Sequence, residues 1–191
     1  VWADRLAAAE RASVELAADL SPPFATPLPD GDLTAQLTLI ARLINANLGV
    51  RVLNVSFGSF DSHDDQLGPH AELLADLDAA IKAFYATLAA TWSHRVALMT
   101  FSEFGRRPEA NGSRGTDHGT SSVLFVIGDN VKGGLHGQAP SLTALDDRGD
   151  PAVTVDYRSV YRSVLGGWLG GDHAAILGAT YPDLGLFRAT P

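Results

Sequence analysis

The sequence predicts an α/β fold with a mostly parallel sheet flanked by helices. Two segments, 95–101 and 121–128, are nearly continuous apolar runs of strand length, which is typical of strands covered on both faces in a parallel sheet. A third segment, 50–57, is also strand-like, and a long helical pattern over 71–92 separates it from 95–101. A strand, a helix and a strand in this order form a βαβ unit, whose two strands are parallel.

The first part of the chain is predicted to be helical on both sides of a proline-rich loop. Residues 1–20 are rich in alanine and have a helical pattern, whereas the loop over 21–31 contains four prolines, which a helix interior does not tolerate. A second helix is expected from Asp32, as its N-terminal cap, to about Asn47, with Gly49 ending it. Its apolar stripe consists of Leu37, Ile40, Leu43 and Ile44.

The remaining elements are defined by apolar patterning and by glycine. The strand over 50–57 precedes the longest and clearest helix of the chain. After the strand over 121–128, a glycine-rich connection leads to an amphipathic helix over 156–171, which Gly166 and Gly167 interrupt.

Length and composition limit the class of protein. The chain has 191 residues, enough for one substantial core, and we expect a single α/β domain over residues 1–191. The net charge of −8 argues against a nucleic-acid partner, because a nucleic-acid-binding surface is normally basic. No segment approaches the roughly 20 apolar residues of a membrane span. The sequence has no cysteine, so any metal must be bound by His, Asp or Glu.

Polar residues gather where the predicted strands end. Asp61 and His63 follow the first predicted strand, and Glu103 follows the second. Asp117 and His118 lead into the third strand, so they reach the same edge only if the long loop before them folds back over it. Ligands bind at the carboxyl ends of strands in open α/β sheets, and these five residues are therefore the candidate site.

The residue types favour a metal. Without thiols, carboxylates and imidazoles are the usual ligands of zinc, manganese or iron, and calcium or magnesium is the less favoured alternative. The same acidic residues also fit a merely solvated loop, and the Asp117–His118 pair also fits a turn cap. Glu103 is a candidate ligand or general base. Arg106 either clamps an anion or pairs with Glu103.

Read together, several motifs resemble a known family. The segments "FDSHDDQ", "SEFGR", "NGSRGTDHGT", "VKGGLHG", "PSL" and "VDYRSVY" are similar to those of the bacterial domain of unknown function family 1501. The resemblance extends over roughly residues 35–170, in the family's order. Typical members are longer, and this chain resembles their C-terminal half. Because Val1 already lies in a helical pattern, we expect an incomplete portion of a larger domain, with a deliberately shortened chain as the alternative.

The resemblance implies an alkaline-phosphatase-like fold and metal site, since members of that family are similar to the alkaline phosphatase and sulfatase superfamily. That superfamily binds divalent metals at the carboxyl edge of its sheet. Asp61 and His63 fit its Asp/His group, and His118 fits its final histidine, with Asp117 beside it. An alternative alignment takes Asp117 and His118 as an Asp–His pair and His136 as the final ligand.

One position departs from the superfamily pattern. Glu103 and Phe104 stand where an Asp–His pair would fall, which weakens a second metal position. The superfamily's early Asp and its Ser or Thr nucleophile have no counterpart in this sequence and would lie in the N-terminal half of the same protein. That half would then be needed for activity.

The function implied is metal-dependent hydrolysis of a small anionic phosphate or sulfate ester. Typical family members often begin with a twin-arginine export signal, so the resemblance also implies a periplasmic or exported protein. One alternative is a non-catalytic α/β domain whose polar residues form a hydrogen-bonded cluster that organises the loops. Another is an interaction module that recruits a partner protein.

Overall fold

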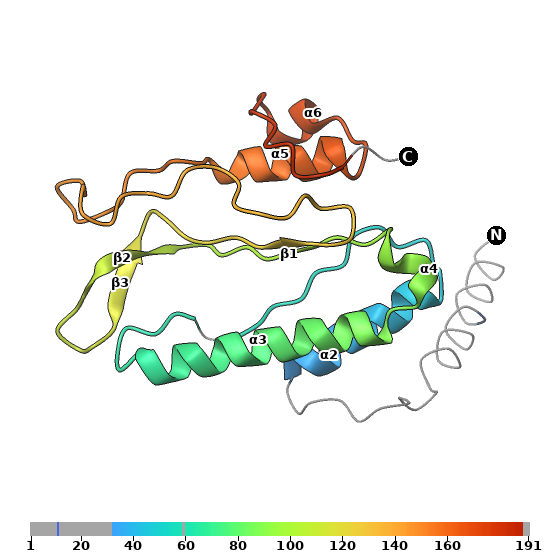
Figure 1. Cartoon of the computed structure of the whole chain (residues 1–191), viewed down its shortest axis with the longest axis horizontal. Coiled ribbons are helices and arrows are strands. Elements are labelled where there is room, and N and C mark those ends of the chain that lie inside the picture. Colours follow the sequence, from blue (N-terminus) through green and yellow to red (C-terminus); the bar gives the residue numbers. More distant parts are fainter. Residues whose placement is uncertain (1–10, 12–31, 59, 189–191) are drawn as a thin grey trace. The chain divides into compact units, whose positions relative to one another are not determined.

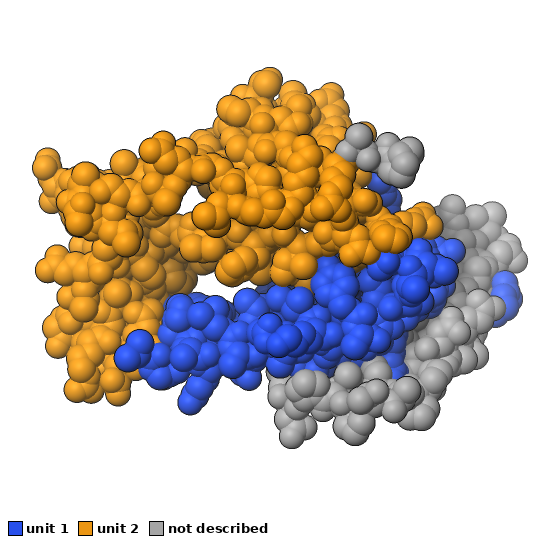
Figure 2. All heavy atoms as spheres, viewed as in Figure 1, with its two compact units in different colours: residues 1–61, 67–93 blue, residues 62–66, 94–191 orange. Residues whose placement is uncertain are grey.

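The computed structural model describes Arg11 and residues 32–58 and 60–188. Arg11 is helical, but the rest of the predicted helix over 1–20 and the proline-rich loop over 21–31 lie outside the described residues. The described chain is mixed α/β, with five helices and two short antiparallel sheets (Figure 1). It divides into two compact units, unit 1 (1–61 with 67–93) and unit 2 (62–66 with 94–191), which Figure 2 colours separately. The single domain over 1–191 stays a prediction.

Unit 1 is built on two packed helices, α2 (Asp32–Asn45) and α3 (Leu67–Thr87). The buried apolar positions of α2 recur every four residues, which places them on one face of the helix. Of the predicted stripe, Leu37 is buried, whereas the three other members are half-buried. The buried apolar side chains of the two helices are Leu33, Leu37, Ala41, Ala80, Ala83 and Phe84.

The predicted helix over 71–92 is two helices in the structure. The helix α3 begins earlier than predicted, at Leu67, because Pro69 lies in its first turn, where the missing backbone N–H is not needed. It ends at Thr87, and α4 (Ala90–Ser93) follows. At this break the Asn45 side chain donates to the Thr87 carbonyl at 3.0 Å and accepts from the Ala89 N–H at 2.9 Å. A single amide therefore satisfies backbone groups that the end of α3 leaves open.

The prediction of a strand over 50–57 is wrong. Within the described residues, this segment pairs with no strand. Val50 and Val52 are 55% and 70% exposed, although both are strand-forming residues. Apolar character favours an extended chain, but a strand exists only where a neighbour satisfies its backbone N–H and C=O groups.

The parallel sheet is also wrong, because both sheets of unit 2 are antiparallel. The strand β1 (Leu98–Met99) pairs with β4 (Val126–Ile127), and β2 (Gly105–Ala110) pairs with β3 (Thr116–Gly119). The β2–β3 hairpin connects β1 to β4 along the chain. The strands β2 and β3 are joined by a short hairpin loop and therefore run antiparallel, whereas parallel strands need a crossover of a dozen or more residues. The βαβ unit is absent from the described residues because its first strand does not form.

The core of unit 2 forms between β1, β4, the helix α5 (Tyr157–Gly167) and the segment near Phe187. Asp156 caps α5 by accepting from the Arg158 N–H, and the helix ends at the glycine pair that the sequence singled out. A further short helix, α6 (His173–Leu177), was not predicted. The core side chains are Val160, Leu186 and Phe187, with Ala97, Met99, Leu124, Val126, Val131, Val164, Trp168 and Leu184 packed against them.

Candidate metal site

The site begins with the segment 62–66, which runs along the loop of the β2–β3 hairpin. The Asp65 N–H donates to the Ser113 carbonyl at 3.0 Å, and the Gln66 N–H donates to the Arg114 carbonyl at 3.1 Å. The Thr116 hydroxyl donates to the Gln66 side-chain oxygen at 2.8 Å. These bonds hold the backbone next to His63 against the hairpin.

Gly115 makes this close approach possible. A Cβ at this position would lie 2.4 Å from the carbonyl carbon and oxygen of His63, far inside van der Waals contact. The residue is buried. Only glycine lets the two backbones approach so closely, so the side chain of His63 owes its position to Gly115.

The second histidine, His118, projects from β3, where it lies opposite Arg106 in the antiparallel ladder. The Phe104 ring stacks on the His118 ring at a centroid separation of 4.0 Å and an interplanar angle of 12°. The Arg106 guanidinium lies 5.0 Å from the centre of the same phenyl ring. The stacked phenyl ring limits the rotation of the His118 imidazole, which orients its Nε2.

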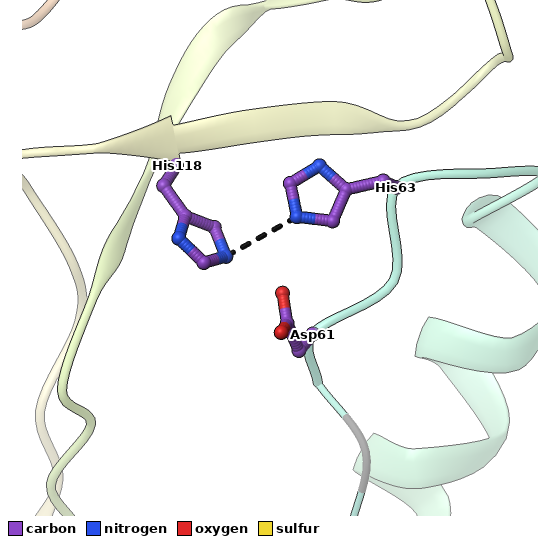
Figure 3. A group of neighbouring side chains, drawn as sticks. All are labelled: Asp61, His63 and His118. Atoms are coloured by element: carbon purple, nitrogen blue, oxygen red, sulfur yellow. Dashed lines mark hydrogen bonds between the residues drawn. The ribbon is translucent and has the colours of Figure 1, made fainter.

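Three side chains bring potential ligand atoms together, namely Asp61, His63 and His118 (Figure 3). One atom from each lies within 4.8 Å of the other two, and all three residues are exposed. Asp61 precedes His63 by two residues. The Nε2 atoms of the two histidines are 3.3 Å apart. Two nitrogen ligands of a tetrahedral zinc ion, each at 2.0–2.1 Å, lie about 3.3–3.4 Å apart, so the two imidazoles fit one ion.

Asp117 lies beside this group. Its Oδ1 is 3.2 Å from the Nδ1 of His63 and 3.1 Å from the Nδ2 of Asn111. The hydrogen bond from Asn111, followed by that from His63, lowers the pKa of the Asp117 carboxyl below its usual value. The side chain is therefore an ionised acceptor at neutral pH.

Asn111 connects several parts of the hairpin loop. Its Nδ2 also donates to the His63 carbonyl at 2.9 Å, and its Oδ1 accepts from the N–H groups of Ser113 and Gly115, both at 3.0 Å. Asn111 was not among the predicted site residues. Its signal was the Asn–Gly pair at 111–112, which is typical of a turn.

The other predicted site residues are placed differently. Glu103 is exposed, in the bend between β1 and β2, and does not belong to the Asp/His/His group. The guanidinium of Arg106 donates to the Thr116 carbonyl in addition to its contact with Phe104. The His136 ring bonds to the Lys132 carbonyl at 2.8 Å, and this histidine is not part of the group either. The catalytic roles of Glu103 and Arg106 stay predictions.

The fold and the site define a mixed α/β protein with an exposed Asp/His/His cluster suited to one divalent cation. Residues 6–173 match the family described as "Protein of unknown function (DUF1501)". The chain belongs to this family, as its motifs predicted. No curated protein and no solved structure matches the chain. Among the described residues, no helix has both the length and the apolar character that a membrane span requires.

Proposed function

We propose that this protein is part of an alkaline-phosphatase-like hydrolase that uses a divalent metal to hydrolyse a phosphate or sulfate ester. The observation that carries the proposal is the 3.3 Å separation of the two histidine Nε2 atoms, with the Asp61 carboxylate close by. Mixed nitrogen and oxygen ligands favour zinc, manganese or iron. A bound ion of this kind polarises an ester and lowers the pKa of an attacking group.

The chain's own residues would hold the ion and orient the substrate. Asp61, His63 and His118 would supply three protein ligands, the number that is usual in catalytic zinc sites. Glu103 and Arg106 are proposed as general base and anion clamp, and the Arg106 side chain would have to exchange its bond to the Thr116 carbonyl for one to the substrate. The nucleophile is proposed to come from the N-terminal half of the same protein.

The first test is the metal content of the purified protein, measured by elemental mass spectrometry. We expect about one zinc, manganese or iron ion per chain. The variant His118→Ala should lose it. His136→Ala is the matched control, because His136 is an exposed histidine outside the cluster and its ring bonds to the Lys132 carbonyl in its own loop. A folded wild-type protein that binds no ion, even when each is supplied in excess, would refute the metal site.

The second test is catalysis. A metal-loaded chain, alone and together with the upstream half of the protein, is assayed against aryl phosphate and aryl sulfate esters. We expect hydrolysis only with the metal present. Hydrolysis that His118→Ala leaves unchanged would contradict the assignment of the site.

A second function is favoured by the hydrogen bonds around Asn111. This side chain bonds to three backbone groups and to Asp117, so the same polar cluster also organises the hairpin loop. In a non-catalytic domain, these hydrogen bonds would serve only to organise the loop. Its signature would be a loss of stability in His118→Ala without any bound metal in the wild type.

A further inference from the structure

Asp117 lies beside His63 and outside the Asp61/His63/His118 group. Its Oδ1 faces the Nδ1 of His63, at 3.2 Å. The Nε2 atom, on the other side of the His63 ring, is the one that faces His118. Asp117 and the proposed ion therefore lie on opposite sides of one imidazole.

This arrangement selects one form of the ring. The same Oδ1 of Asp117 accepts a hydrogen bond from the Asn111 amide, so this oxygen is an acceptor toward both neighbours. The hydrogen between Asp117 and His63 must therefore be on Nδ1. A neutral imidazole with hydrogen on Nδ1 has its lone pair on Nε2, the atom that a metal needs.

Asn111 holds both the backbone and the ring partner of His63. The Nδ2 group donates to the His63 carbonyl at 2.9 Å and to Asp117 at 3.1 Å, so both of its hydrogens are used. Its Oδ1 is engaged by the N–H groups of Ser113 and Gly115. The reverse orientation of the amide would face an oxygen toward the carboxylate, so these bonds define a single orientation.

We infer that Asn111 and Asp117 form a positioning pair that fixes His63 with its hydrogen on Nδ1 and its Nε2 lone pair directed at the cation site. The inference rests on the proposed function, because the pair would serve the proposed metal site. The position of the hydrogen on the His63 ring can nevertheless be measured in the metal-free protein. It gives Asp117 a role outside the ligand set. Partners of this kind typically change metal affinity about 10–100-fold when they are removed.

The decisive measurement is a long-range ¹⁵N–¹H NMR spectrum of the histidine rings in the metal-free protein. It is recorded near pH 8. The His63 signals are assigned by their absence from His63→Gln. We expect the wild type to have hydrogen on Nδ1 of His63, and Asp117→Ala to shift His63 toward the form with hydrogen on Nε2. Hydrogen on Nε2 of His63 in the wild type would overturn the inference.

Two variants sharpen this test. Asn111→Asp keeps an oxygen for the loop N–H groups but turns the donor toward Asp117 into a second acceptor, so we expect it to shift the ring form as Asp117→Ala does. Asp65→Asn is the matched control, since Asp65 is an exposed carboxylate in the segment 62–66 that pairs with Arg114 on the surface. An unchanged ring in Asn111→Asp, or an equal change in Asp65→Asn, would also overturn the inference.

Zinc titration by calorimetry separates this inference from the proposed function. We expect Asp117→Asn to bind zinc about 10–100-fold more weakly than the wild type, and Asp65→Asn to bind it equally well. A wild type with hydrogen on Nδ1 that binds no metal would refute the metal site and leave the positioning pair in place. A wild type that binds metal with hydrogen on Nε2 would refute the positioning pair and leave the metal site in place.

Discussion

The substitution Gly115→Ala should greatly weaken metal binding without changing any ligand. The added Cβ would lie 2.4 Å from the His63 carbonyl group, whereas ordinary van der Waals contact begins at 3.4 Å. The two backbones must therefore separate by about 1 Å, and both contact atoms belong to rigid backbone rather than to a flexible side chain. His63 moves with its backbone.

The metal site does not tolerate a shift of this size. Metal–ligand distances are held to about 0.2 Å, so a displacement of about 1 Å removes His63 from the coordination sphere. We expect Gly115→Ala to bind zinc at least about 100-fold more weakly than the wild type, which corresponds to about 2.8 kcal/mol.

The assay is calorimetric zinc titration of the wild type, Gly115→Ala and Gly112→Ala. Gly112 is the matched control, because it lies in the same loop and an added Cβ there meets nothing within 4 Å. Near-ultraviolet circular dichroism, which detects Trp168 stacked on Phe187, verifies that the core of unit 2 is intact. Equal zinc affinity in the two glycine variants would refute the claim that close backbone approach positions His63.

Three further predictions concern stability. Ser163→Ala should lower the free energy of unfolding by about 1–3 kcal/mol, because the buried Ser163 hydroxyl donates to Asp183 and accepts from the Leu184 N–H. Denaturant titration measures this loss, and Ser122→Ala, at an exposed position, should show none. Hydrogen bonds from the Gly185 N–H and then from Ser163 lower the pKa of the Asp183 carboxyl. The ionised carboxylate therefore adds to the free energy of unfolding above pH 3.8, the unperturbed pKa. This added stability is lost as the pH falls through the lowered pKa. Asp183→Asn should therefore flatten the acid limb of the stability curve, and an unchanged limb would contradict this. Asn45→Ala should lower the melting temperature of unit 1 by removing about 1 kcal/mol at the end of α3, and hydrogen exchange at Ala89 should quicken selectively.

Much of the helical structure could be predicted from the sequence because its signals are local. The apolar repeat of α2, the capping Asp156 and the glycine pair that ends α5 lie within a few residues of the features they define. The strands were predicted less well. A run such as 50–57 has the composition of a strand, but nothing in those eight residues states whether a partner will pair with it.

In the candidate site, too, residue types could be predicted from the sequence, whereas contacts between distant residues could not. Asp61, His63 and His118 could be singled out because carboxylates and imidazoles near predicted strand ends are chemically distinctive, and the structure brings these three together. Asn111 was not singled out, because an Asn–Gly turn has an ordinary structural explanation, and Phe104 was noted only as a departure from the superfamily pattern. Their roles depend on contacts with His63 and His118.

The sequence by itself therefore determined the residue chemistry, much of the helical structure and the membership of the family. Only the tertiary structure decided that the strands run antiparallel, because that depends on which backbone groups meet through the β2–β3 hairpin. It also decided that two histidines separated by 55 positions bring their Nε2 atoms to 3.3 Å. A distance between residues so far apart in the chain follows from the packing of whole segments, and here from one glycine that lets two backbones touch.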